Sequence, residues 1–119
     1  MPHPEALPHF ENAIIPPSKL LGYALNPNHP RGRAKARVFA SALGFNAQNW
    51  EALVVAVLAE LSRHPAIRRE IRPHGSEFTV DIPVTGPGGS ATVRSGRILE
   101  AESRTPRLTT IYVKRQQHV

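Results

Sequence analysis

The apolar positions of the chain follow a helical spacing in the first half and an alternating spacing in the second. Between residues 46 and 62 they recur at intervals of three and four, which is typical of a helix with one broad apolar face. The residues of that face are Trp50, Leu53, Val54, Val57, Leu58 and Leu61. From Ala66 onward apolar and polar residues alternate, and turn signals interrupt them at short intervals. The pattern therefore predicts helices first and strands afterwards.

Two further helical segments precede the core helix. One is predicted over Pro30–Leu43, because proline suits the first turn of a helix and Gly44 supplies a left-handed end. A segment of one or two turns is predicted over Lys19–Leu25, with Ser18 as its N-cap. Asn46 is the expected N-cap of the core helix, which runs to about Ser62.

Four strands are predicted after the helices, at Ile67–Arg72, Phe78–Val84, Ala91–Leu99 and Arg107–Val113. Short loops between consecutive strands favour an antiparallel meander. A sheet of this kind buries one face against helices. The expected fold class is therefore α+β, with two or three N-terminal helices packed on one face of a four-stranded antiparallel sheet.

The first 17 residues hold five of the 12 prolines. Proline lacks a backbone donor and fixes φ, so this segment is expected to be an extended arm without helix, either lying along the surface or mobile. Ile14 and Ile15 are expected to anchor its end. A chain of 119 residues makes one domain. The expected organisation is an arm over 1–17 and a single α+β domain over 18–115.

Composition excludes several functional classes. Cysteine is absent, which removes disulfides, thiol nucleophiles and thiolate metal sites. The longest apolar stretch, Ala52–Ala59, is far shorter than the roughly 20 residues of a membrane span. The first 15 residues lack the apolar region of a signal peptide, so a cytoplasmic protein with no membrane contact is expected. The histidines are scattered and Asp81 is the single aspartate, so neither a metal site nor a cofactor is expected.

The basic charge indicates a polyanionic partner. The formal net charge is +6, and 12 of the 15 basic residues are arginines, whose planar guanidinium groups suit phosphate. Arg31 and Arg33 open the first arginine cluster and are assigned to substrate phosphate. An alternative remains open, in which these arginines are solvated or paired with the glutamates. Aromatic residues make up only 6% of the chain, which argues against a wide platform for base stacking.

The remaining polar residues fit metal-independent cleavage of RNA, in which the 2′-hydroxyl attacks the adjacent phosphorus. This reaction needs proton-transfer groups and cations. Alternation places Arg94 on one face of the third strand, and Leu108, Thr110 and Tyr112 on one face of the fourth. Arg94, Thr110 and Tyr112 therefore converge if those faces coincide. Lys35 lies four residues before Phe39, so it is predicted to lean toward the body of the protein. The alternatives are a solvated sheet arginine, threonines that only favour strands, and a lysine whose stem covers the edge of the core.

Five motifs over residues 20–113 resemble an uncharacterised family of small bacterial domains. They are Leu25-Asn26-Pro27, Lys35-Ala36-x-x-Phe39, Leu43-Gly44-Phe45, Val93-Arg94-Ser95 and Pro106-Arg107-Leu108-x-Thr110-x-Tyr112. The two-helix, four-strand layout of that family is similar to the barnase, EndoU, colicin and RelE group of ribonuclease toxins. The resemblance therefore implies cleavage of RNA by basic and hydroxyl residues on a sheet face, without a metal.

The resemblance also assigns roles to residues. It implies that Lys35 and Arg94 bind phosphate and stabilise charge, that His29 or Tyr112 transfers protons, and that Thr110 positions a phosphate oxygen. Ser95 and Arg107 join Arg31 and Arg33 as implied substrate contacts. The predicted function is a metal-independent ribonuclease of the toxin type, acting on RNA and restrained by an antitoxin or immunity protein. The alternative is a non-catalytic basic module that binds RNA or protein in a toxin–antitoxin or defence system.

Overall fold

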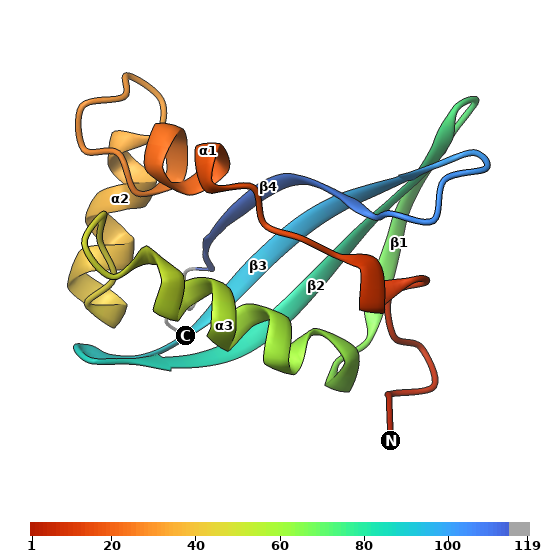
Figure 1. The fold of residues 1–119 in the computed structure, drawn as a ribbon, viewed down its shortest axis with the longest axis horizontal. Coiled ribbons are helices and arrows are strands. Elements are labelled where there is room, and N and C mark those ends of the chain that lie inside the picture. The colour runs from red at the N-terminus through yellow and green to blue at the C-terminus, as the bar shows by residue number, and fades with distance from the viewer. Residues whose placement is uncertain (115–119) are drawn as a thin grey trace, which may run out of the picture.

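The computed structural model describes residues 1–114, and its second half forms one antiparallel sheet. The strands are β1 (Ala66–Arg72), β2 (Gly75–Gly86), β3 (Gly89–Glu100) and β4 (Arg107–Val113). Their order in the sheet is β1-β2-β3-β4, so each strand pairs with its neighbour in sequence and β4 is an edge strand (Figure 1). The predicted meander is confirmed, and β4 has the predicted bounds.

The first half of the chain forms the helices. They are α1 (Pro17–Lys19), α2 (Arg33–Val38) and α3 (Trp50–Glu60). A π-helical turn continues α1 over Leu20–Ala24, another continues α2 over Phe39–Leu43, and a 3-10 turn follows α3 over Leu61–Arg63. Helix α3 lies across one face of the sheet, while α1 and α2 lie together near the β4 edge (Figure 1). The predicted α+β class, with helices on one sheet face, is therefore confirmed.

The core lies between α3 and the sheet. Leu53 and Val57 of α3 are buried, and so are Val80 and Ile82 of β2 and Val93 of β3. These strand residues alternate with polar ones, so the opposite face of the sheet is left polar. Among residues 1–114, no helix has the length and apolar character needed to span a bilayer.

Side-chain hydrogen bonds move the helix starts away from the predicted positions. The helix predicted from Pro30 begins at Arg33, because the ring of His29 holds the preceding turn. Helix α3 begins at Trp50 and not after Asn46, because the Asn46 side chain accepts the N–H of Gln48 in a turn. Ser18 lies inside α1 and is not its N-cap, since that helix starts at Pro17.

The proline-rich arm packs along the body. Leu7 and Ile15 are among the buried core residues, whereas Ile14 is 56% exposed and does not serve as an anchor. The arm also contains a short 3-10 turn over Phe10–Asn12, so the expectation of no helical structure is wrong for these residues. One apolar residue on each side of this turn thus fixes the arm.

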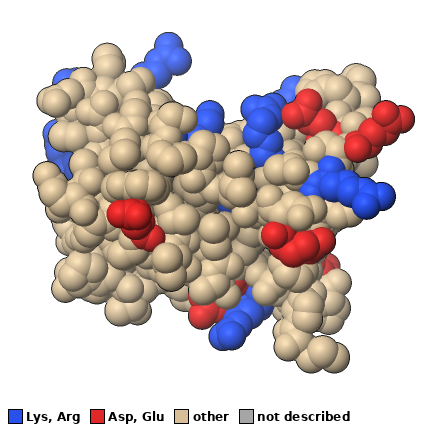
Figure 2. Space-filling view, in the orientation of Figure 1, with Lys and Arg blue, Asp and Glu red and all other residues tan. Residues whose placement is uncertain are grey.

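Positive and negative side chains are mixed on the face of the molecule that carries the helices. Figure 2 shows Lys and Arg alternating with Asp and Glu over the end of the sheet that holds β1, while much of the remaining face is uncharged. Arg72 contacts both Glu70 and Glu77 there. The alternative of ion-paired arginines therefore holds for part of the basic surplus.

Candidate functional site

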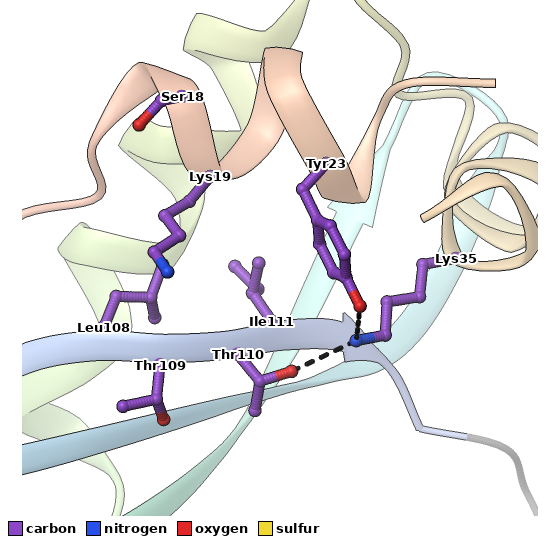
Figure 3. Close-up of a pocket in the computed structure, with 8 residues that line it drawn as sticks. All are labelled: Ser18, Lys19, Tyr23, Lys35, Leu108, Thr109, Thr110 and Ile111. Atoms are coloured by element: carbon purple, nitrogen blue, oxygen red, sulfur yellow. Dashed lines mark hydrogen bonds between the residues drawn. The ribbon is translucent and has the colours of Figure 1, made fainter. Parts of the chain in front are cut away.

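The side chain of Lys35 crosses from α2 to the edge strand β4. Its Nζ lies 3.4 Å from the Tyr23 hydroxyl and 3.3 Å from the Thr110 Oγ1 (Figure 3). It also lies 4.7 Å from the ring centroid of Tyr23 and 5.6 Å from that of Tyr112, within cation–π range. No carboxylate among residues 1–114 forms an ion pair with this half-buried ammonium.

The helical row of Lys35 explains this position. Phe39 and Leu43, one and two turns further along, are fully buried. Residues four apart share a helix face, so the lysine stem follows them toward the body of the protein. The predicted inward lean of Lys35 is therefore confirmed.

A polar cavity of about 290 Å³ lies beside Lys35, between the α1 region and β4. Its lining residues are Ser18, Lys19, Tyr23, Lys35, Leu108, Thr109, Thr110 and Ile111. Figure 3 shows Lys19, Tyr23 and Lys35 reaching down from the helical side toward the strand, where Thr110 faces the ammonium. Two ammonium groups and several hydroxyls thus line one cavity, which suits an anion with several oxygens.

Arg94 lies in the middle of the polar sheet face. The strand register places it opposite Asp81 on one side and Tyr112 on the other, and places Gly96 opposite Thr110. The predicted shared face of Arg94, Thr110 and Tyr112 is therefore confirmed. The prediction is wrong for Leu108, which is buried in the core opposite Arg97, because the register shifts between Gly96 and Arg97. Lys35 reaches this face through its contacts with the two β4 residues.

The guanidinium of Arg94 is engaged by a carboxylate. Its Nε donates to Asp81 Oδ1 at 2.8 Å and its Nη2 donates to Oδ2 at 3.0 Å, while Lys114 Nζ donates to Oδ2 at 3.1 Å. These bonds, the one from Arg94 foremost, lower the pKa of Asp81 to about 2. In return the carboxylate raises the pKa of Arg94. With Lys35 included, three cations and one anion leave a local charge of +2.

His29 supports the site from behind. Its Nδ1 accepts the backbone N–H groups of Arg31 and Gly32, both at 3.0 Å. The neutral ring therefore carries its proton on Nε2. The ring packs edge-on against Tyr23, with centroids 4.7 Å apart. His29 thus orients Tyr23 and the turn before α2, and it is outside the lining of the cavity.

Ser95 does not belong to the site. It is fully buried on the core face between Val80 and Ile111, because neighbouring strand residues point to opposite faces. Its hydroxyl has no hydrogen-bond partner among the described residues. The implied contact of Ser95 with substrate is therefore wrong.

The predicted arginine contacts lie apart from Lys35. Arg107 pairs with Glu100, 3.1 Å away, at the start of β4. Arg33 lines a separate groove with Arg37, and Arg31 is exposed on the turn before α2. None of these three arginines lines the cavity at Lys35.

Another arginine is buried in the core. Arg97 is only 1% exposed, and its Nη1 donates to the carbonyl oxygens of Ile14 and Pro106 at 2.9 and 3.1 Å. Burial lowers its pKa to about 10. Arg97 ties the arm to the start of β4 and lies on the face opposite the site.

Sequence reasoning missed Tyr23, Lys19 and Asp81. A signal for Asp81 was present, because the turn between Gly86 and Gly89 fixes the β2–β3 register and places Asp81 opposite Arg94. Tyr23 and Lys19 had no comparable signal, since their approach to β4 depends on how the chain folds before α2. Among residues 1–114, no three His, Asp or Glu side chains gather as metal ligands.

One family model matches nearly the whole chain. It is described as Domain of unknown function (DUF6883), and it covers residues 6–115. The match includes most of the proline-rich arm, which the resemblance over residues 20–113 left out. Neither the curated proteins nor the solved structures yield a match. The chain therefore belongs to the DUF6883 family, a family of domains of unknown function.

Proposed function

We propose that the protein is a metal-independent ribonuclease whose scissile phosphate binds at Lys35. One observation carries the proposal: a half-buried ammonium without a carboxylate partner among the described residues, held between two hydroxyls and two aromatic rings. An ammonium in this partly desolvated place attracts an anion more strongly than one in water. The hydroxyls and rings around it leave one side open toward the cavity that the lysine lines.

The chemistry follows from the groups around that phosphate. The 2′-oxygen forms a bond to phosphorus, and the bond from phosphorus to the 5′-oxygen breaks. Lys35 offsets the charge that grows on the phosphoryl oxygens, and Thr110 donates a hydrogen bond to one of them. The hydroxyls of Tyr23 and Tyr112 are assigned to proton transfer, one accepting the 2′ proton and the other protonating the leaving 5′-oxygen. The products are a 2′,3′-cyclic phosphate and a 5′-hydroxyl.

Two residues assist without touching the substrate. His29 positions Tyr23 through the edge of its ring. Arg94, which the resemblance implied as a phosphate ligand, lies opposite Tyr112 and is clamped by Asp81, so we assign it to positioning Tyr112.

The test is cleavage of end-labelled total RNA and a tRNA pool by the purified protein in EDTA. We expect wild type to leave 2′,3′-cyclic phosphate ends, and Lys35→Ala to lose at least a hundredfold in rate, the typical loss when a charge-stabilising donor is removed (about 10²–10³). Arg63→Ala is the matched control, because it removes one exposed cation from the far end of α3. Its rate should stay within about twofold of wild type. Intact RNA with wild type, or full activity of Lys35→Ala, would contradict the proposal.

A second candidate is a non-catalytic module that binds RNA or protein. The clamp of Asp81 on Arg94 favours it, because the central sheet arginine is already neutralised. This module would give a salt-sensitive gel shift that depends on Lys35, and no cleavage product.

The proposed ribonuclease also implies a partner. A toxin of this type acts in the cytoplasm and needs an antitoxin or immunity protein. We propose that this partner covers the cavity with a carboxylate directed at Lys35, because the described part of the chain gives the ammonium no acidic partner. Such a partner would compete with RNA for the site.

A further inference from the structure

We infer that the apolar hollow on the other side of Lys35 binds one nucleobase of the RNA strand. The hollow measures about 370 Å³ and is lined by Ala34, Lys35, Val38, Tyr112 and Val113. We call it the Val38 hollow. The inference rests on the proposed function, because it takes the strand to be held by its phosphate at Lys35.

The position of Lys35 links the hollow to the polar cavity. Its side chain lines both spaces, and Thr110 on one side and Tyr112 on the other are both β4 residues. The ring of Tyr112 forms a wall of the hollow, with its centroid 5.6 Å from Lys35 Nζ. A ligand whose anionic group sits at the ammonium therefore has an apolar space with an aromatic wall beside it.

Such a ligand has an anionic group beside a flat apolar group, and a nucleotide has both. RNA-binding sites stack unpaired bases on aromatic side chains while cations hold the backbone. Ala34 and Val38 of α2 and Val113 of β4 provide the apolar remainder of the wall. A free phosphate would fill only the polar cavity and would leave the Val38 hollow unused.

The lining also sets the expected selectivity. Beyond Lys35 and the Tyr112 hydroxyl, no lining side chain of the hollow from residues 1–114 carries a hydrogen-bonding group. Reading the edge of a base needs placed donors and acceptors, whereas stacking accepts any base. The hollow should therefore hold a base by stacking, with little preference among the four.

The experiment compares two ligands that cannot be cleaved because they lack the 2′-hydroxyl. One is a fluorescent deoxy-tetranucleotide, and the other is the same backbone with abasic sugars. With the full chain, we expect the base-containing ligand to bind at least fivefold more tightly, which is the lower end for one stacked base. Lys35→Ala should weaken both ligands by a similar factor and leave their ratio unchanged.

Two variants test the hollow itself. Ala34→Leu fills it from an exposed helix position, and Tyr112→Leu removes the ring while keeping apolar bulk. Each should bring the ratio of the two affinities close to one. Ala34→Leu should change abasic binding less than about twofold, whereas Tyr112→Leu also removes a ring beside Lys35 Nζ and should weaken both ligands. Tyr112→Phe, which keeps the ring, should preserve the ratio. Circular dichroism melting checks that each variant is folded.

A ratio near one for wild type, or a ratio that persists in both Ala34→Leu and Tyr112→Leu, would overturn the inference. Failure of the proposed ribonuclease is distinguishable, because neither ligand can be cut. A wild-type ratio above five with no cleavage of RNA leaves a base-binding site without catalysis. Cleavage of RNA with a ratio of one leaves a ribonuclease without this base site.

Discussion

Replacing Asp81 by asparagine separates what the carboxylate does for stability from what it does to the site. Two hydrogen bonds from Arg94 and one from Lys114 hold this carboxylate, and its pKa falls from an ordinary 3.8 to about 2. At about 1.4 kcal/mol per pKa unit, that difference corresponds to about 2 kcal/mol of folding free energy. Asp81 is 27% exposed, so solvent weakens these contacts only in part. We expect Asp81→Asn to lower the free energy of unfolding at pH 7 by about 2 kcal/mol.

The pH dependence of that difference has a defined sign. Because the pKa of Asp81 is lower in the folded protein than in the unfolded chain, its stabilisation is complete above about pH 4. It is lost as the pH falls through about 2, and below that value the carboxyl is protonated in both states. Urea unfolding of wild type and Asp81→Asn at pH 7, 5, 3 and 2 measures this. A difference below about 0.5 kcal/mol at pH 7, typical of an exposed ion pair, would refute the reasoning. A difference equally large at pH 2 would refute it too.

The same substitution should strengthen binding of RNA. Asp81→Asn releases Arg94 and Lys114 to contact phosphate. Each new phosphate contact makes the slope of log affinity against log salt concentration steeper by about 0.7 for a single strand. Glu100→Gln is the matched control: it makes the same charge change and releases Arg107, which is 58% exposed and lies outside the cavity. Equal gains in affinity for the two variants would mean that only net charge matters.

Two further substitutions test the supports of Lys35. His29→Ala removes the acceptor of two N–H groups before α2, so it should lower the free energy of unfolding by about 1 kcal/mol, as loss of a helix cap does. His29→Asn keeps an acceptor and should recover most of that stability. Thermal melting of the two variants and wild type measures the difference. Gly96→Ala would place a Cβ 2.7 Å from Thr110 Cγ2, so it should destabilise the fold by about 1–3 kcal/mol and weaken binding of the abasic ligand. Unchanged melting and binding of Gly96→Ala would show that the β3–β4 contact is looser than the structure indicates.

Strand positions were predictable because their pattern and their turns fix them together. β4 keeps the predicted bounds Arg107–Val113, although a register shift between Gly96 and Arg97 breaks the alternation between Leu108 and Thr110. Helix starts were less predictable, because polar side chains near them also accept N–H groups of the preceding turn. Asn46 and Asn49 both suit an N-cap by type, but Asn46 accepts the N–H of Gln48 and Asn49 accepts the N–H of Asn46. Helix α3 therefore begins at Trp50 without a side-chain cap.

Some residues of the candidate site were also predictable from local patterns and others were not. Period-two alternation brought Arg94, Thr110 and Tyr112 to one face, and the helical row brought Lys35 toward them. Alternation alone also places Ser95 on the other face. Its assignment to substrate came from a motif, and a motif does not say to which face of the sheet a side chain points. The position of Tyr23 could not be predicted from the sequence. Its contact with Lys35 joins two separate segments, and neither the helical spacing nor the strand alternation relates them.

Lys35 and Arg94 approach the same tyrosine from different elements, yet their charges are satisfied differently. Arg94 has a bidentate carboxylate, whereas the half-buried Lys35 has only hydroxyls and ring faces among residues 1–114. Neutral partners offset less of the desolvation of an ammonium than a carboxylate does, so the arrangement at Lys35 stabilises the fold less than a second ion pair would. A protein keeps such a poorly compensated group where activity requires it. The contrast between the two cations therefore favours the proposal that Lys35 contacts the ligand and that Arg94 belongs to the framework that supports it.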